Sequence, residues 1–391
     1  MKILIAPNTF KGTITANDVA TAIKDGFLNV TKDLEILCYP ISDGGDGSLD
    51  TMLEIFGGIR MYSNSINPIG EKIEVSWALL NNNKAFIETA LTFGLALLPK
   101  HKRNPYLTTS RGVGELIKTG LDFGIRDFII GVGGSANNDA GSGMMKSLGV
   151  KYLDKSNKEL LDGGIFLNKL FYIDTSKIDS RLKESKFLFL SDSSVPLIGD
   201  KGVSILYSPG KGASKKMAYN LDKSLLHYTN VVKKQFNTDI RNKPMSGSGG
   251  GIISAAELFM DTSSKYGIEF ILQELNLIEK LQGVDLVITG EGQLDEQTIY
   301  NKAPYGIAKL AKTFKIPVIS INAKLGDGYE KAFDNYIDII ASISGENGWT
   351  KGIVNEKDIY IASRDIFIQY LSRIEQKKDI KGLICTKQLI D

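Results

Sequence analysis

The chain has 391 residues, of which 42% are hydrophobic, and this is enough for two or three domains with hydrophobic cores. Its 47 basic and 45 acidic residues leave a formal net charge of +2, which gives no electrostatic basis for binding nucleic acid or a membrane surface. The two cysteines, Cys38 and Cys385, form neither a disulfide framework nor a metal-binding spacing. A reducing cytoplasm fits this cysteine usage best. The N-terminal apolar run is too short for a signal peptide, and no run approaches the length of a transmembrane helix.

The first 60 residues predict a strand, a helix, a strand and a second helix. The run "KILIAP" is the first strand, and Thr15 with Asp18 forms a capping-box-like start to a helix with an apolar face. The run "LEILCY" is the second strand, and "SLDTMLEIF" is a helix that ends at Gly57.

From about residue 60 the pattern favours antiparallel strands, with turns at Asn67-Pro68 and at residues 81–83. A helix follows in "SRGVGELIKTGLDFG", then a strand in "DFIIGV" and another in "KFLFLSD". A long helix is expected within residues 213–236.

From about residue 265 the α/β alternation returns, with strands in "VDLVITG", "IPVISIN" and "YIDIIASI", helices in "APYGIAKLAKTF" and near the end, and a peripheral lysine-rich terminus. Because both ends of the chain supply strands with helical crossovers, they predict one discontinuous Rossmann-like α/β domain of residues 1–60 plus 265–391. Residues 61–264 then form an inserted, mixed α/β domain.

Glycines are clustered rather than spread: there are 40 in the chain, and several groups of them follow apolar runs. Such clusters are typical of ligand loops at strand ends. In the loop "PNTFKGT", Lys11 can hold a phosphate or can simply be a solvated lysine before a helix. In "SDGGDG", Asp43 and Asp46 can bind Mg²⁺ or a substrate hydroxyl, or can cap the following helix.

The loop "GVGGSANNDAGSG" permits a rival interpretation. Gly131, Gly133 and Ala136 match the dinucleotide-binding pattern G-x-G-x-x-[GA], and Asp154 stands where an acid that binds a ribose is expected. The polar "SANND" is unusual for a Rossmann helix, which packs closely at this point. Asp139 in this loop is either a chemical group or a helix cap.

Two later loops carry charged groups. Asp192 ends a predicted strand and Lys211 lies between two glycines, but Ile205 stands where the first glycine of a P-loop would be. In "ITGEGQLDEQT", Glu291 and Asp295 follow a buried strand and offer oxygens suited to Mg²⁺. The stretch "MSGSGGGIISAAE" offers backbone N–H groups for an anion, and a flexible turn explains its glycines equally well.

Taken in order, these loops resemble the type I glycerate kinase family. The resemblance rests on five stretches: "APNTFKGTITA", "PISDGGDGS", "ETALTFGLALL", "GGSANNDAGSGMMKSLG" and "VDLVITGEGQLDEQTIYNKAP". It implies a two-domain α/β fold with a Rossmann-like half and an active site in the cleft between the domains. It also implies ATP-dependent phosphorylation of glycerate with Mg²⁺, favouring 2-phosphoglycerate as the product over 3-phosphoglycerate.

The resemblance assigns roles to particular residues. Asp43, Asp192, Asp295 and Lys11 are expected to be catalytic, with Asp192 and Asp295 as candidate Mg²⁺ ligands; which aspartate is the base is left open. The expected substrate- and nucleotide-binding residues are Gly44, Gly45, Asp46, Gly133, Gly134, Ser135, Asn138, Asp139, Lys211, Glu291, Gln297 and Lys302.

The chain departs from the family pattern at four places: Val195, Gly210, residues 245–251 and Asn301. These departures leave open a catalytically weakened protein that binds sugar acids. The other alternative is an NAD(P)-dependent oxidoreductase that uses the loop from Gly131 to Ala136.

Overall fold

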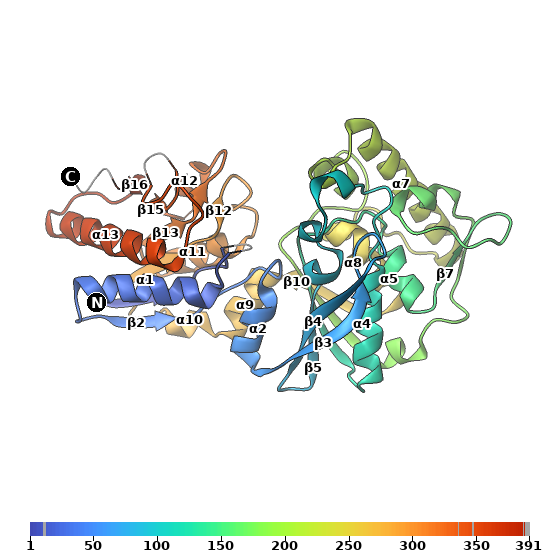
Figure 1. The fold of residues 1–391 in the computed structure, drawn as a ribbon, viewed down its shortest axis with the longest axis horizontal. Helices are drawn as coiled ribbons and strands as arrows, with labels where there is room; N and C mark the ends of the chain where they lie inside the picture. Colours follow the sequence, from blue (N-terminus) through green and yellow to red (C-terminus); the bar gives the residue numbers. More distant parts are fainter. Residues whose placement is uncertain (11–12, 335, 346–347, 386, 388–391) are drawn as a thin grey trace. The chain divides into compact units, whose positions relative to one another are not determined.

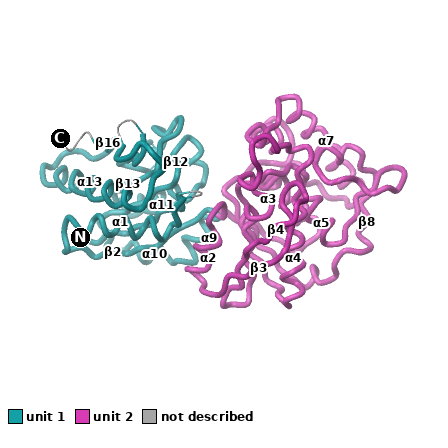
Figure 2. Tube along the Cα trace, viewed as in Figure 1, with its two compact units in different colours: residues 1–43, 267–391 teal, residues 44–266 magenta. Residues whose placement is uncertain are grey.

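A computed structural model describes residues 1–10, 13–334, 336–345, 348–385 and 387 (Figure 1). Strands and helices alternate along much of the chain, which confirms the predicted α/β class. The chain forms two compact units, residues 1–43 with 267–391 and residues 44–266, called here unit 1 and unit 2 (Figure 2).

Unit 2 begins earlier in the chain than the predicted inserted domain, at Gly44 instead of residue 61. The reason is that helix α2 (Ser48–Phe56) packs against strands β3, β4 and β5 of unit 2 and therefore belongs to it. The second boundary, between Tyr266 and Gly267, lies close to the predicted position.

Unit 1 contains a six-stranded parallel sheet of order β16-β15-β13-β11-β1-β2. Its strands are β1 (Lys2–Ile5), β2 (Glu35–Cys38), β11 (Leu286–Thr289), β13 (Val318–Asn322), β15 (Ile339–Ser342) and β16 (Leu383–Cys385), and β12 (Gln293–Leu294) pairs separately with β14 (Lys324–Leu325). Its helices are α1 (Ala16–Val30), α9 (Gly267–Glu274), α10 (Leu277–Lys280), α11 (Ala303–Thr313), α12 (Lys331–Asp334) and α13 (Glu356–Glu375). Strand β16 was not predicted, because its three residues lie in the lysine-rich end.

The strand order of unit 1 reverses at β1. The chain passes from β1 to β2 on one side and then continues with β11, β13, β15 and β16 on the other. This is the flavodoxin-like order, and in open α/β sheets ligands bind outside the carboxyl ends of the strands at such a switch point. The loops that follow β1 and β11 are therefore the first place to look for a site in unit 1.

The core of unit 1 follows from the apolar periodicity of its elements. Alternate strand residues such as Ile3 and Ile5 share one buried cluster with residues of α1 and α13. The rings of Phe27 and Phe367 stack in this cluster with centroids 4.2 Å apart. The predicted caps are present: Thr15 accepts a hydrogen bond from the backbone N–H of Asp18 at 3.2 Å.

Unit 2 contains a mixed sheet of order β10-β9-β6-β5-β4-β3, in which β3, β4 and β5 are antiparallel and β5, β6, β9 and β10 are parallel. The strands are β3 (Gly58–Ile66), β4 (Lys72–Leu80), β5 (Lys84–Glu88), β6 (Asp127–Val132), β9 (Lys186–Ser191) and β10 (Asp261–Tyr266), and β7 (Lys151–Leu153) pairs with β8 (Tyr172–Asp174) in a separate hairpin. The predicted turn at Asn67-Pro68 is confirmed, since the Asn67 side chain accepts from the N–H groups of Ile69 and Glu71.

The α-helices of unit 2 are α2, α3 (Ala90–Phe93), α4 (Arg111–Asp122), α5 (Ser142–Ser147), α6 (Val203–Tyr207), α7 (Lys215–Phe236) and α8 (Ser248–Phe259). Short 3₁₀ turns lie at Leu95–Leu97, Lys100–Lys102, Gly164–Lys169, Ser180–Glu184 and Pro209–Lys211. Helix α8 opens with three consecutive left-handed residues, Gly249, Gly250 and Gly251. Only glycine adopts such a run without strain, and a Cβ at Gly250 would lie 2.4 Å from the Asn137 carbonyl oxygen.

The close packing of α1 on α13 makes a testable prediction about Gly26. Helix propensity alone favours Gly26→Ala by up to about 1 kcal/mol. In the structure, however, the new Cβ would lie 2.6 Å from the backbone oxygen of Tyr360, so the two helices would have to separate. We expect Gly26→Ala to lower the free energy of unfolding by about 1–3 kcal/mol, measured by denaturant titration of each variant.

The matched control is Thr21→Ala, at an exposed position of the same helix, where propensity alone should raise stability by a few tenths of a kcal/mol. A Gly26→Ala protein as stable as this control would contradict the close helix packing.

Candidate active site

The carboxyl ends of β1 and β11 lie side by side in unit 1. Beyond them, the backbone N–H of Asn8 donates to the carbonyl oxygen of Gly290 at 2.9 Å. Asn8 is buried, and its Nδ2 lies 3.4 Å from a carboxylate oxygen of buried Asp43, which follows β2. Lys11 lies outside the described residues. The switch point thus brings together the loops that follow three neighbouring parallel strands.

An acidic network occupies the loop after β11. The buried carboxylate of Glu291 accepts from Thr298 Oγ1 at 2.6 Å. The carboxylate of Asp295 accepts from the backbone N–H of Gln297 at 2.9 Å and from Gln293 Nε2 at 3.0 Å. These bonds fix two carboxylates in a loop that the glycines at 290 and 292 allow to turn.

Lys302 is the counter-charge of this network. Its Nζ lies 3.5 Å from Asp295 Oδ1 and 3.9 Å from Glu291 Oε2, and its side chain is largely buried. Because the lysine sits at the start of α11, it reaches back over the loop that precedes it. Two carboxylates and one ammonium group therefore converge on one point of unit 1.

Asn322 contributes to the same edge, and sequence reasoning missed it. This fully buried residue ends β13, and its Oδ1 accepts from the N–H of Glu291 at 3.3 Å and from Ser320 Oγ at 3.0 Å. Its Nδ2 donates to the carbonyl oxygen of Ala341 at 3.2 Å. The sequence feature that could have indicated this residue is a polar side chain at the end of the apolar run "IPVISIN".

In unit 2, two glycine-rich loops meet at the carboxyl ends of the parallel strands. A Cβ placed on Gly133 would lie 2.5 Å from the Cα of Gly45, and one on Gly134 would lie 2.5 Å from Asp46 Oδ1. A Cβ on Gly131 would lie 2.5 Å from the Gly44 carbonyl oxygen. Here the glycines of "SDGGDG" and "GVGG" are required because two backbones approach closely.

Glu88 holds the same segment from the end of β5. Its carboxylate accepts from the backbone N–H groups of Gly47 and Leu49, both at 2.9 Å, and its exposed fraction is 3%. Burial, opposed by these two hydrogen bonds and reinforced by the charges of Asp46 and Asp50, raises the pKa of Glu88 to about 7. The sequence signal was a glutamate closing the apolar run "KAFIE".

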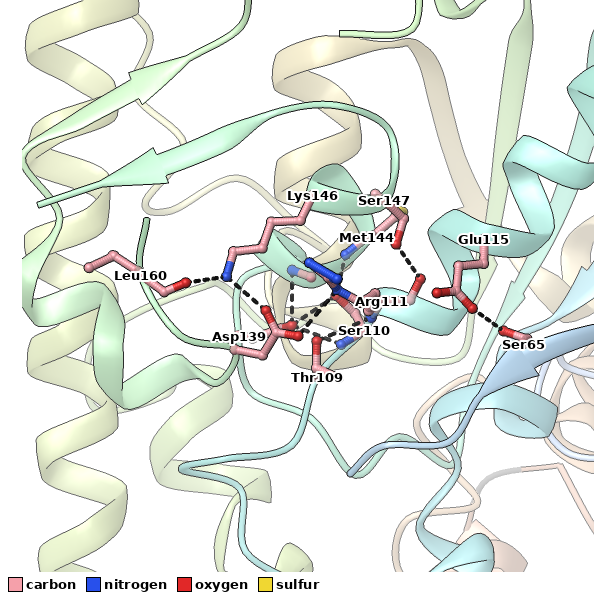
Figure 3. Close-up of polar contacts among 12 residues, drawn as sticks. Ser65, Thr109, Ser110, Arg111, Glu115, Asp139, Met144, Lys146, Ser147 and Leu160 are labelled. Atoms are coloured by element: carbon pink, nitrogen blue, oxygen red, sulfur yellow. Dashed lines mark hydrogen bonds and ion pairs between the residues drawn. The ribbon is translucent and has the colours of Figure 1, made fainter. Parts of the chain in front are cut away.

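Asp139 is fully buried where the chain enters α5, and Figure 3 shows it next to Ser110 and Thr109 at the start of α4. Its Oδ2 accepts from the N–H and hydroxyl of Ser110, at 2.8 and 2.9 Å, and from the N–H of Gly143 at 3.2 Å. Its Oδ1 accepts from Asn137 Nδ2 at 2.8 Å and from the N–H of Gly141 at 3.2 Å. The carboxylate thus ties the amino ends of α4 and α5 together.

The side chain of Lys211 contacts the loop that follows β6. Its Nζ donates to Ser135 Oγ at 2.9 Å and to the carbonyl oxygen of Asn137 at 2.7 Å. Burial lowers the pKa of Lys211 to about 7, while the nearby Asp139 carboxylate raises it. The predicted site residues Ser135, Asp139 and Lys211 are therefore neighbours in the structure.

The remaining predicted residues of unit 2 lie along the same strand ends. Asn138 is buried, and its Nδ2 donates to Ser204 Oγ at 2.8 Å. Asp192 directly follows β9 and is half-buried. The structure thus divides the predicted site residues between the strand ends of unit 1 and those of unit 2.

The dinucleotide-binding interpretation finds no support in the geometry. No helix begins within the stretch from Gly131 to Ala136, because α5 starts only at Ser142. Asp154 follows β7 in a separate hairpin, where its carboxylate accepts from the N–H groups of Ser156 and Lys158. Neither the helix end nor the acid is placed as a Rossmann site requires.

Among the residues that the structure describes, no group of three or more His, Cys, Asp or Glu side chains could hold a metal ion. Within the same described ranges, no helix is long and apolar enough to cross a membrane.

The fold and the strand-end loops define an α/β protein with the charged, glycine-rich loops of a phosphate-handling enzyme. The family model "Glycerate kinase family" matches residues 3–365, and the chain belongs to this family. It is 41% identical to the glycerate 2-kinase of Escherichia coli K12 over 88% of this chain and 90% of that protein. It is 38% identical to the glycerate kinase of Halalkalibacterium halodurans over 87% of this chain and 90% of that protein.

A solved structure shows the same fold. The crystal structure of a Salmonella typhimurium LT2 protein named as a glycerate kinase 2 superposes with a TM-score of 0.77 at 33% identity. The match covers 96% of this chain and 99% of that chain. The resemblance found from the sequence motifs is therefore confirmed.

The Asp139 network makes a stability prediction. In Asp139→Asn, an amide NH₂ would replace one acceptor oxygen and face buried donors, so we expect a loss of about 3 kcal/mol in the free energy of unfolding. The control is Asp154→Asn, in an exposed turn, for which we expect less than about 1 kcal/mol. Thermal unfolding of both variants checks this; a fully stable Asp139→Asn protein would refute the structural role.

The burial of Lys211 predicts a pH dependence of stability. The pKa of Lys211 is near 7 in the folded protein and about 10.5 in the unfolded chain, so the unfolded state binds more protons between these values. The wild-type protein should therefore gain stability relative to Lys211→Met as the pH rises from about 7 towards 10. Denaturant unfolding of both proteins across this range checks the sign. A constant difference would mean that Lys211 is not buried as described.

Proposed function

We propose that this protein transfers the terminal phosphoryl group of ATP to D-glycerate, with 2-phosphoglycerate as the favoured product. The observation that carries the proposal is the family match over residues 3–365, which includes every loop of the candidate site. The names of the relatives from Escherichia coli and Halalkalibacterium halodurans support the substrate and the reaction.

The geometry suits phosphoryl transfer, which needs positioning and charge neutralisation more than covalent catalysis. Unit 1 offers Glu291 and Asp295 held together with Lys302, at the switch point where an α/β sheet binds ligands. Unit 2 offers glycine loops whose backbone can approach a ligand closely, with Lys211 beneath them. Lysines of both units can bind the phosphates of ATP or the carboxylate of glycerate.

Mg²⁺ is part of this proposal. Asp295, with Glu291 beside it, and Asp192 each offer carboxylate oxygens of the kind that the ion prefers. When bound with ATP, the ion neutralises phosphate charge. Lys302 keeps the two carboxylates of unit 1 close together, and Thr298 fixes the orientation of Glu291.

Three of the four departures from the family pattern, at Asn301, Val195 and Gly210, are accommodated structurally. Asn301 replaces a glycine at a left-handed position with φ of 62°, and asparagine is one of the few other residues that tolerates this conformation. Val195 is buried in the core of unit 2, and a Cβ at Gly210 would meet nothing within 4 Å. These positions therefore give no structural reason to favour a weakened binding protein over an active kinase.

We further propose that the protein is located in the cytoplasm, where its substrate ATP is available. The free cysteines support it: Cys38 lies in β2 and Cys385 in β16, at opposite edges of one sheet, so they do not pair.

The decisive experiment is an ADP-release assay of the purified chain with ATP and D-glycerate, with and without Mg²⁺. We expect Mg²⁺-dependent turnover, and ³¹P NMR of the product distinguishes 2- from 3-phosphoglycerate. Glycerate binding without turnover would instead support the binding protein. Tight NADH binding without kinase activity would support the oxidoreductase.

Asp295→Asn tests the acidic network of unit 1. Removing one carboxylate charge at constant size should lower kcat by about a hundredfold or more, whether Asp295 acts as a base or holds the metal. The matched control is Asp334→Asn, an exposed acid on α12 of the same unit, which should retain its turnover. Near-normal turnover of Asp295→Asn at saturating ATP and Mg²⁺ would show that this carboxylate is dispensable.

A further inference from the structure

The proposed function does not explain why a buried glutamate, Glu88, is needed at the end of β5. It ends β5 in unit 2, and its side chain points at the start of α2 rather than at solvent. Helix α2 begins after Gly47, which has no side chain and therefore cannot cap it. The two oxygens of Glu88 replace the missing cap by accepting from the N–H groups of Gly47 and Leu49.

The segment that Glu88 holds is also the one that carries Asp46. Residues 44–46 lie against the loop after β6, with Asp46 Oδ1 next to Gly134 and Gly45 against Gly133. In this segment the backbone of residues 44–46 lies against the neighbouring loop, and the Ser48 hydroxyl donates to the Gly45 carbonyl oxygen. The two hydrogen bonds to Glu88 form a tether that holds Gly47 and Leu49, which follow this segment directly in the chain.

We propose that Glu88 is a positioning residue, whose carboxylate holds residues 44–49 by their backbone so that Asp46 is presented next to Gly134. This inference rests on the proposed function, because Asp46 and Gly134 are among the residues that the family resemblance assigns to substrate and nucleotide binding. Glu88 itself contacts no reacting atom; it acts through the segment that it holds.

The protonation state of Glu88 controls this tether. An ionised carboxylate offers acceptor lone pairs on both oxygens, whereas the protonated acid carries a hydroxyl that cannot accept equally well from the second N–H group. The charged groups that face Glu88 are Asp46 and Asp50, and Asp50 pairs in turn with Arg60 of β3. With the pKa of Glu88 at about 7, the tether weakens as the pH falls below neutrality.

The kinetic test compares Glu88→Gln with wild type across pH 6 to 9. At pH 8 we expect kcat/KM for glycerate to fall at least tenfold in Glu88→Gln. The wild-type profile should show an acidic limb near pH 7 that the variant lacks. Loss of the charged form of Lys211 would instead lower activity on the basic side, so the two groups are distinguishable.

The matched control is Glu115→Gln on α4, which removes a carboxylate bonded to Ser65 Oγ at 3.1 Å in the same unit. We expect its kcat/KM to stay within twofold of wild type and its acidic limb to remain. If Glu88→Gln behaves like this control in rate and pH profile, Glu88 is only a structural cap and the proposal is wrong.

A second measurement requires neither activity nor a variant. Hydrogen exchange of wild-type amides in residues 47–56, corrected for intrinsic rates, should show at least threefold higher protection at pH 8 than at pH 6. Equal protection would overturn the proposal, even if Glu88→Gln failed to fold. If the chain lacked kinase activity but showed this change in protection, the proposed function would be wrong. The inference that Glu88 holds residues 44–49 would then remain supported.

Discussion

Parallel strand pairing is the constraint on which both units depend. Every parallel strand must be followed by a crossover, so the loops that leave the carboxyl ends of neighbouring strands gather at one edge of the sheet. In unit 1 this edge collects Asn8, Asp43, Glu291 and Asn322 from four strands. In unit 2 it collects Glu88, the loop that leads to Asp139, and Asp192. Side chains far apart in the sequence become neighbours for this reason alone.

Several charges at these edges are buried, and each of those named here has partners. Asp139 accepts from the amino ends of two helices, Lys211 donates to Ser135 and Asn137, and Glu291 accepts from Thr298. A buried charge without such partners would cost several kcal/mol, so these networks fix where each group points. The same burial moves the pKa values of Glu88 and Lys211 to about 7, where both can respond to pH near neutrality.

Glycine has two separate functions in this fold. At Gly131, Gly133 and Gly134, the absence of a Cβ allows the "SDGGDG" segment to lie directly on the neighbouring loop. At Gly249 to Gly251, three left-handed residues in succession turn the chain into α8, and a Cβ at Gly250 or Gly251 would clash with Asn137 or Ala140. Both uses bring backbone atoms of distant segments together, which suits ligand loops that must present N–H groups.

The sequence by itself determined the element types, the discontinuous α/β unit and the family, because strongly periodic apolar runs and whole-loop motifs are local signals. Only the tertiary structure placed α2 in unit 2 and formed β16, since both depend on packing partners far along the chain. It also revealed Glu88 and Asn322, whose roles lie in hydrogen bonds to the backbone of residues 30 or more positions away. Asp139 shows the same limit: the sequence leaves its role open between a substrate ligand and a helix cap, and only the tertiary structure shows the five donors around its carboxylate.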